Sequence, residues 1–396
     1  MSPATSVSAG ARTAERSRGV LIHAVRLVDG GLERPDAWIR FVDGRVAAVG
    51  TGAGWAAEPG DEIVDGRDAA GESATLTPGF VDIHGHGGGG AAYDDGAEAI
   101  LAARELHRRH GTTRAVVSLV TATLDDLERR VAAIADLAAV DPSVLGSHLE
   151  GPFLDVAHHG AHEPSLLVPP TPDAIDRLLE AGRGSIRQVT LAPELPGGIA
   201  AIRQIVAAGA TVAVGHTDAD LGAAQAAFDA GATILTHAFN AMPGLHHRSP
   251  GPVGAAFADP RVTLELIADG VHLHPIVLRA AVDAAPGRIA FVTDAMAAAG
   301  AADGSYELGP LAVRVDGGVA RLADGTIAGS TLTQDAALRT AVAAGVPLAA
   351  TVTALTSTPA RAIGRPDLGS LAVGSPADAV LLDGALQVRR VWTGRL

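Results

Sequence analysis

Residues 77–86 read Thr77-Pro78-Gly79-Phe80-Val81-Asp82-Ile83-His84-Gly85-His86, a short apolar run that ends in two histidines. Seven further apolar runs of similar length follow along the chain. Continuous apolar runs are typical of parallel strands that are buried on both faces. The eight predicted strands are Gly79–His84, Arg114–Val120, Val144–Glu150, Ile186–Leu191, Thr211–His216, Thr233–His237, Val262–Ala268 and Arg288–Thr293.

Ala-rich stretches with helical periodicity follow most of these strands. They are Ala97–His110, Leu124–Ala139, Pro172–Ala181, Gly198–Ala208, Ala219–Ala230 and Pro275–Ala284. Eight strands alternating with helices predict an α/β fold, a closed (β/α)₈ TIM-type barrel. The alternative is an open doubly wound sheet, but the Gly-rich fingerprint expected after its first strand is poorly matched here.

The two ends of the chain have a different texture, with short strands separated by Gly and Asp turns. The N-terminal strands are Val20–Val28, Ala37–Val42 and Arg45–Val49, and the C-terminal strands are Ala379–Leu382 and Gln387–Trp392. Chain termini often lie close together, so we expect both ends to build one small β domain.

We therefore divide the chain into a small β domain and a barrel. The β domain comprises residues 19–75 and 365–396, and the barrel comprises residues 76–364. A β-hairpin insertion is expected at about 299–329, from strands Tyr306–Asp316 and Gly318–Asp324, before helices Gln334–Ala344 and Thr353–Ile363. Residues 1–18 are expected to form a disordered tail.

Composition excludes several classes of function. The net charge of −14, with no long block of like charge, argues against a nucleic-acid partner. No segment has the length and apolarity of a membrane span, and residues 1–18 lack the apolar region of a secretory signal, so we expect a cytoplasmic protein. The chain has no Cys and no Lys. Any metal ion must therefore be held by His, Asp or Glu, without a carbamylated lysine.

Polar side chains end five of the eight strands, at the face where TIM barrels carry their active sites. They are His84, His86, Glu150, His216, His237 and Asp294. Each has a structural alternative, since the histidines suit loops, Glu150 a salt bridge and Asp294 a helix cap. Their convergence favours a site for a divalent metal, namely Zn, Fe, Mn or Co. Such an ion activates water for hydrolysis, and Asp294 is our candidate for moving the proton.

Two segments resemble the amidohydrolase superfamily, namely the opening strand Thr77–His86 and the stretch Leu368–Ala379. Further motifs resemble N-acetylglucosamine-6-phosphate deacetylases. They are His148-Leu149-Glu150-Gly151-Pro152-Phe153, Gly215–Ala219, Thr236–Met242, Asp269–His272 and Val292–Met296. The resemblance covers Gly19 to Leu396 and implies a metal-dependent barrel with a small β-sandwich domain built from both chain ends. It implies a homodimeric enzyme that hydrolyses the N-acetyl amide of N-acetyl-D-glucosamine 6-phosphate, giving glucosamine 6-phosphate and acetate in amino-sugar metabolism.

The resemblance also implies roles for individual residues. Glu150, His216 and His237 would hold the catalytic metal, and Asp294 would be the acid/base. Because the His84-Gly85-His86 pair is present, one or two ions are expected, with Asp294 joining that pair on a second ion. The implied substrate-binding residues are Ala161, His162, Asn240, Ala241, Arg248, Asp269, His272, Ile327, Ala328 and Gly329, with Arg248 and His272 on the phosphate.

Three alternative functions stay open at this point. The first is deacetylation of N-acetylgalactosamine 6-phosphate, and the second is cyclic-amide hydrolysis as in other members of the superfamily. The absence of Lys argues against relatives that bridge two metals with a carbamylated lysine. The third is a non-catalytic barrel scaffold, which predicts lost ligands, whereas this chain keeps them.

Overall fold

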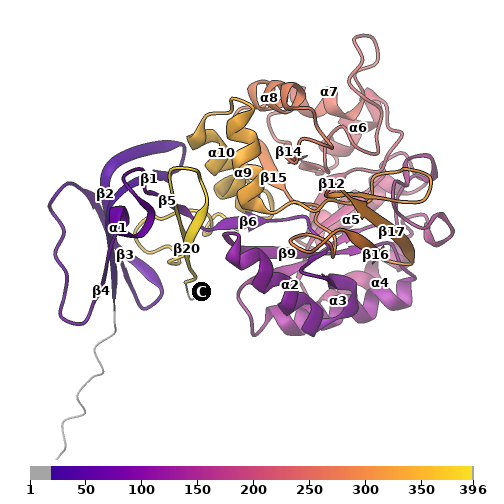
Figure 1. The fold of residues 1–396 in the computed structure, drawn as a ribbon. Coiled ribbons are helices and arrows are strands. Elements are labelled where there is room, and N and C mark those ends of the chain that lie inside the picture. Colours follow the sequence, from indigo (N-terminus) through magenta and orange to yellow (C-terminus); the bar gives the residue numbers. More distant parts are fainter. Residues whose placement is uncertain (1–18, 395–396) are drawn as a thin grey trace, which may run out of the picture.

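The computed structural model describes residues 19–394, so the predicted tail at 1–18 lies outside the described residues. The chain forms a large barrel and a smaller β domain beside it (Figure 1). The indigo and yellow segments of Figure 1, from the two ends of the chain, lie together in the small domain.

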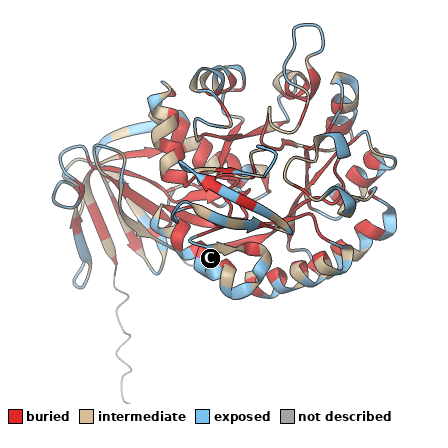
Figure 2. Cartoon of the chain, turned by 45° about the vertical axis from the view of Figure 1, so that its right-hand side comes forward, coloured by how far each residue is buried: buried red, intermediate tan, exposed pale blue. Residues whose placement is uncertain are grey.

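All eight predicted barrel strands are present, and they pair in chain order within one parallel sheet. They are β6 (Phe80–Asp82), β9 (Thr112–Val120), β10 (Val144–Glu150), β11 (Ile186–Leu191), β12 (Thr211–Val214), β13 (Ile234–Leu235), β14 (Thr263–Ile267) and β15 (Ile289–Val292). The strands are almost wholly buried, as Figure 2 shows in red. This confirms the predicted barrel and places the carboxyl ends of its strands on one face.

The first and last strands meet at a seam. Within residues 19–394, no strand ladder joins β6 to β15. Instead, the Asp294 amide donates to the His84 carbonyl at 2.8 Å, and the Thr293 hydroxyl donates to the Asp82 carboxylate at 2.6 Å. The barrel is therefore closed by a few specific bonds, at the same end as the polar strand ends.

Helices cover the outside of the barrel (Figure 1). They are α2 (Ala97–Arg109), α3 (Leu124–Ala138), α4 (Pro172–Gly182), α5 (Gly198–Ala207), α6 (Leu221–Asp229), α7 (Gly251–Ala258), α8 (Pro275–Ala284), α9 (Gln334–Ala343), α10 (Leu348–Leu355) and α11 (Ser357–Ala362). Thr123 and Thr171 cap α3 and α4 with their hydroxyls, as N-cap residues do. No helix within residues 19–394 is long and apolar enough to cross a membrane.

The prediction of one helix over Thr353–Ile363 was wrong. The structure has α10, which begins after Pro347, and a separate α11. The two helices are divided at Thr356, whose φ of −131° and ψ of −88° are not helical. The helix α7 was not predicted, because its Gly and Pro residues hide the helical pattern.

The small domain is built from both chain ends, and its strands form one seven-stranded sheet. Its strands are β1 (Val20–Asp29), β2 (Leu32–Val42), β3 (Arg45–Thr51), β4 (Glu62–Asp65), β5 (Thr75–Pro78), β19 (Ala379–Leu382) and β20 (Val388–Trp392), with the short helix α1 (Gly66–Ala70). The strand β1 pairs with β4 through Val20–His23 and with β5 through Arg26–Leu27. The sheet surrounds its own apolar core, which includes Ile39 and Leu76.

The insertion after β15 differs from the predicted hairpin. It has three strands, β16 (Gly304–Leu308), β17 (Leu311–Asp316) and β18 (Val319–Arg321). A turn at Gly309-Pro310, with Gly309 at φ +54°, divides the run predicted as a single strand. Leu308 and Val313 pack against the barrel residue Val120, so the insertion covers part of the barrel mouth.

The remaining short elements are β7 (Gly87–Gly88), β8 (Ala91–Ala92), η1 (Tyr93–Asp95), η2 (Val156–His158) and η3 (Pro164–Leu166).

A buried ion pair joins the two domains. Arg114 of β9 donates Nε and Nη2 to the two oxygens of Asp378, at 2.7 and 3.0 Å, just before β19. Its Nη1 donates to the Pro142 carbonyl at 2.6 Å, and the Asp378 carboxylate also accepts from the Gly394 amide at 2.7 Å. The Arg114 guanidinium therefore donates hydrogen bonds to partners in both domains.

We predict that Asp378→Ala lowers the free energy of unfolding by about 3–5 kcal/mol, because it leaves the Arg114 charge buried without a partner. The measurement is chemical denaturation followed by circular dichroism. The matched control is Asp367→Ala, which breaks the similar but half-exposed pair with Arg365 and should cost no more than about 1 kcal/mol. Equal effects of the two substitutions would contradict a special role for the buried pair.

Candidate metal centre

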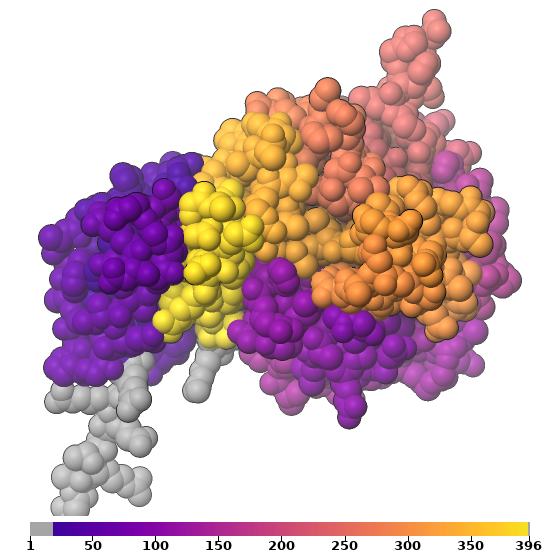
Figure 3. All heavy atoms as spheres, viewed as in Figure 1, coloured from indigo at the N-terminus to yellow at the C-terminus, as the bar shows by residue number. Residues whose placement is uncertain are grey.

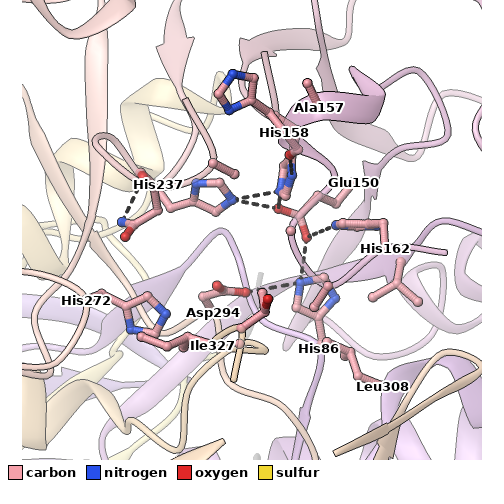
Figure 4. A pocket seen from close by; sticks show the side chains of 18 residues that line it. His86, Glu150, Ala157, His158, His162, His237, His272, Asp294, Leu308 and Ile327 are labelled. Atoms are coloured by element: carbon pink, nitrogen blue, oxygen red, sulfur yellow. Dashed lines mark hydrogen bonds and ion pairs between the residues drawn. The ribbon is translucent and has the colours of Figure 1, made fainter. Parts of the chain in front are cut away.

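Five strands bring polar side chains to one end of the barrel. Glu150 is the last residue of β10, and each of the others lies within four residues of the end of its strand. The set is His84 and His86 after β6, Glu150 on β10, His216 after β12, His237 after β13 and Asp294 after β15. Figure 4 shows His86, Glu150, His237 and Asp294 pointing toward a common centre. All of these side chains are buried.

Three of these residues have a left-handed backbone, with φ of 48° at His216, 25° at His237 and 48° at Asp294. Such a conformation costs a non-glycine residue on the order of 1–3 kcal/mol and persists only where the surroundings impose it. Here the carbonyl of His216 accepts from the Asp155 amide at 2.9 Å, and that of Asp294 accepts from the Ser330 amide at 2.7 Å. The strained turns direct the side chains into the barrel mouth.

Glu150, His216 and His237 form one compact group. Glu150 Oε1 lies 3.2 Å from His216 Nε2 and 3.1 Å from His237 Nε2, and the two nitrogens are 3.0 Å apart. This is the ligand set predicted for the catalytic metal.

A second group shares Glu150 with the first. His86 Nε2 lies 3.0 Å from Glu150 Oε2 and 3.3 Å from Asp294 Oδ1. His84 Nε2 lies 3.2 Å from Glu150 Oε1, 3.3 Å from His86 Nε2 and 3.6 Å from Asp294 Oδ1. These four ligand atoms lie within 4.8 Å of one another. The geometry therefore brings together two sets of donors with one carboxylate between them.

The chemistry of the donors fits a divalent ion. Ligands held about 2.0–2.1 Å from a tetrahedral Zn²⁺ lie roughly 3.3–3.4 Å from one another, close to the spacings found here. The ring tautomers fit as well. His216 Nδ1 donates to the His158 carbonyl at 2.9 Å, which leaves the lone pair of Nε2 facing Glu150. His84 Nδ1 donates to Glu265 at 3.0 Å, with the same consequence for its Nε2.

His162 also approaches Glu150, with its Nε2 3.6 Å from Oε2. Its Nδ1 accepts from the Thr121 amide at 3.3 Å, so the proton of the neutral ring is on Nε2. A protonated nitrogen has no lone pair for a metal. We therefore interpret His162 as a hydrogen-bond donor into the site, in keeping with its predicted place near substrate.

The two carboxylates of the centre are ionised. Burial raises the pKa of Glu150, but the charge of His84 and the close approach of the His162, His216 and His237 rings hold that pKa well below the usual range.

The pKa values of Asp294 and His86 are also shifted by burial and by their neighbours. Burial raises the pKa of Asp294, but His84 and His86 lower it to about 2. Burial lowers the pKa of His86, yet hydrogen bonds to Asp294 and Glu150 raise it to about 9. Without a metal, the carboxylates thus favour protonation of His84 and His86, whereas burial lowers the pKa of His216 to about 4. A cation at this place satisfies the same carboxylates.

A cavity of about 350 Å³ opens beside the centre, and Figure 4 shows its side chains. Most of the predicted substrate-binding residues line it, and they are Ala161, His162, Asn240, Ala241, His272, Ile327 and Gly329. Leu308 and Thr326 of the insertion form another part of the wall. The pocket therefore lies between the candidate metal ligands and the insertion.

Three predicted substrate residues do not line this cavity. Ala328 is fully buried in the core beneath the insertion. Asp269 lies behind His272 and accepts from its Nδ1 at 2.6 Å. Arg248 is exposed on a hairpin closed by a bridge between His246 and Ser249. Figure 3 shows this segment, just before α7, standing out from the barrel surface.

Sequence reasoning missed three residues near the centre. Glu265 and Gln188 are fully buried inside the barrel and bond to each other, and His158 lines the pocket. A signal for Glu265 was available, because it interrupts the apolar strand Val262–Ala268. The role of Gln188 depends on contacts with distant strands, which local pattern does not reveal.

The model of the Amidohydrolase family matches residues 75–394. The chain is 40% identical to an N-acetylgalactosamine-6-phosphate deacetylase from Escherichia coli O157:H7, over 90% of this chain and 93% of the relative. It is 36% identical to an N-acetylglucosamine-6-phosphate deacetylase from Bos taurus, over 97% and 96% of the two chains.

One solved structure is similar to this chain over almost the whole length of both. It is a mutant N-acetyl-D-glucosamine-6-phosphate deacetylase from Mycobacterium smegmatis in complex with N-acetyl-D-glucosamine-6-phosphate. The identity is 43% and the TM-score is 0.89, over 95% of this chain and 98% of that one. Because the family model and these relatives match most of its length, the chain belongs to the amidohydrolase family.

Proposed function

We propose that this protein hydrolyses the N-acetyl amide of N-acetyl-D-glucosamine 6-phosphate to glucosamine 6-phosphate and acetate. The observation that carries the proposal is the shared carboxylate of Glu150 between two ligand groups, beside a pocket of about 350 Å³. The relatives named for this reaction and the solved complex with this phosphosugar support the choice of substrate.

The donor set suits Zn, Fe, Mn or Co, and we propose two ions per chain. Glu150, His216 and His237 would hold one ion, and His84, His86 and Asp294 would hold the other, with Glu150 contributing to both. A bound divalent ion lowers the pKa of water to about 7 and polarises a carbonyl oxygen. The protein must supply the orientation of the amide and a path for the proton.

Asp294 is our candidate for the proton path. With a pKa held near 2, its carboxylate is ionised and begins the reaction as a base. It accepts a proton from the water whose oxygen forms a bond to the acetyl carbon. When the carbon–nitrogen bond breaks, the same carboxyl group returns the proton to the departing amine. The Nε2–H of His162 is aimed into the pocket and can donate to the acetyl oxygen as negative charge develops there.

His272 is our candidate for binding the 6-phosphate. Burial lowers the pKa of its imidazole, but the hydrogen bond and charge of Asp269 more than offset this and raise the pKa. The ring is therefore more readily protonated, and Nε2 remains free to donate to an anion. In a protein of net charge −14, such a local cation has to offset an unfavourable global field.

Arg248 is exposed and lines no part of the pocket in its own chain. We therefore propose that the protein is a homodimer in which each Arg248 serves the phosphate of the other copy. The projecting hairpin of Figure 3 supports this arrangement.

A cytoplasmic location stays a prediction.

N-acetylgalactosamine 6-phosphate is the second candidate substrate, since the relative from Escherichia coli O157:H7 is named for it. The two sugars differ only in the orientation of the C4 hydroxyl. A site that hydrogen-bonds one orientation leaves buried polar groups unpaired with the other.

We predict that the purified protein releases acetate fastest from N-acetylglucosamine 6-phosphate, with kcat/KM at least about tenfold above that for the galactosamine epimer. Unphosphorylated N-acetylglucosamine and a hydantoin serve as controls and should be poor substrates. Preference for the epimer would replace the proposed substrate, and hydrolysis of the hydantoin alone would remove the deacetylase proposal.

Asp294→Asn should reduce kcat by about 10²–10⁴-fold, because the amide cannot accept the proton. The substitution keeps the size of the side chain, so the melting temperature and binding of the phosphosugar should change little. Metal content is measured alongside turnover, so that loss of an ion is not taken for loss of the base. A variant with normal turnover and early melting would show that Asp294 is structural.

Arg248→Ala should raise KM for the phosphosugar roughly 10- to 100-fold, since a charge-assisted hydrogen bond is lost. Arg203→Ala, on an exposed position of α5, is the matched control and should change nothing. A mixed dimer of one Arg248→Ala chain and one Asp294→Asn chain shows whether Arg248 binds the phosphate in its own active site or in that of the other copy. The activity is measured at a substrate concentration well below KM, where Arg248→Ala and Asp294→Asn homodimers are both slow. If Arg248 acts across the dimer, one site of the mixed dimer is complete and about half of the wild-type activity returns. If Arg248 acts within its own chain, the mixed dimer stays as slow as the two homodimers.

A further inference from the structure

Glu265 is a carboxylate inside the barrel that the proposed reaction does not use. It lies in the middle of β14, between Leu264 and Leu266, and its exposure is 0%. Its Oε2 accepts from His84 Nδ1 at 3.0 Å and from the His237 amide at 3.3 Å. The side chain therefore touches one ligand from each of the two candidate metal groups.

No arginine balances this charge. Within residues 19–394, the only ion-pair partner of Glu265 is His84, and its Oε1 accepts from the neutral amide of Gln188 at 2.8 Å. Burying a carboxylate without a cation is expensive. Glu150 and Asp294 share this condition, since their ion-pair partners among the described residues are all histidines. A structural salt bridge to arginine therefore does not explain Glu265.

The hydrogen bond to Glu265 determines which nitrogen of His84 is available. With the proton on Nδ1 directed at the carboxylate, Nε2 keeps its lone pair and points to Glu150 Oε1 at 3.2 Å. A carboxylate in this position fixes both the tautomer and the ring orientation of a ligating histidine and strengthens it as a ligand.

Three buried carboxylates, Glu150, Glu265 and Asp294, surround the centre, and their ion-pair partners among the described residues are all histidines. A set of histidines and carboxylates of this kind suits divalent metal ions. Glu265 is the member of this trio that lies behind His84 and outside the ligand atoms.

We propose that Glu265 is the positioning residue for the second metal ion, acting through His84. The inference rests on the proposed function, because it assumes that the centre holds metal. The second contact of Glu265, with the His237 amide at 3.3 Å, is longer and reaches the main chain, not the ligating ring of His237, so it bears less on the first ion.

The test compares Glu265→Leu, which removes the acceptor, with Glu265→Gln, whose amide oxygen can still accept from His84. Each protein is titrated with Zn²⁺ against a competing chelator, and bound metal per chain is counted by elemental analysis. We expect the wild type to bind two ions. In Glu265→Leu the weaker site should lose about 10–100-fold in affinity while the other site changes little. Glu265→Gln should recover part of that loss.

Gln334→Leu is the matched control, since it replaces another fully buried polar side chain that bonds only to the Phe291 carbonyl. It should lower the melting temperature without changing the two affinities. Equal loss of both ions in Glu265→Leu, or a Glu265→Leu variant that binds both ions as tightly as the wild type, would overturn the inference. A wild type that is active with one ion would also overturn it, whereas a wild type without metal or amidase activity would instead remove the proposed function.

Discussion

The centre of this protein is a buried carboxylate whose ion-pair partners, among the described residues, are histidines and not arginine. Glu150 is buried at the end of β10 and faces the Nε2 atoms of four imidazoles at 3.0–3.2 Å. A buried carboxylate in that setting must be compensated, and a chain without lysine has few means of doing so. The arrangement of five barrel strands, each ending in a polar residue, follows from the need to surround this one charge.

The seam of the barrel and the metal centre share the same residues. His84 and Asp294 belong to the first and last strands, and the amide of Asp294 donates to the carbonyl of His84. Their side chains then face each other across 3.6 Å within one ligand group. An ion held there would bridge the strands that no ladder joins, so closing the barrel and assembling the site are one structural event. The buried pair of Asp82 and Thr293 supports the seam from below.

The insertion gives the site its wall. A plain barrel ends in an open mouth, whereas here Leu308, Thr326 and Ile327 line a cavity next to the candidate ligands. Leu308 and Val313 pack on Val120 of the barrel, which fixes the three-stranded sheet over the mouth. Partial exclusion of water strengthens the hydrogen bonds and charges inside such a pocket. The insertion therefore shapes the pocket beside the metal centre.

The sequence by itself determined the barrel and the identity of its polar strand ends. Apolar runs at regular spacing reveal buried parallel strands, and a charged or His residue at the end of such a run is conspicuous because burial without a partner is costly. Composition alone excluded thiolate and lysine ligands. The separation of α10 from α11 at Thr356 and the turn at Gly309 were misread, because apolar pattern does not reveal where a backbone turns.

Only the tertiary structure decided how these side chains are used. The contact between His84 and Glu265 joins residues 181 positions apart, and it determines which ring nitrogen faces the centre. The proton on His162 depends in the same way on Thr121, 41 residues away. Arg248 matched a motif, yet its hairpin points away from the pocket of its own chain. Hydrogen-bond direction and the left-handed turns at His216 and Asp294 arise from contacts between distant segments, and no local pattern encodes them.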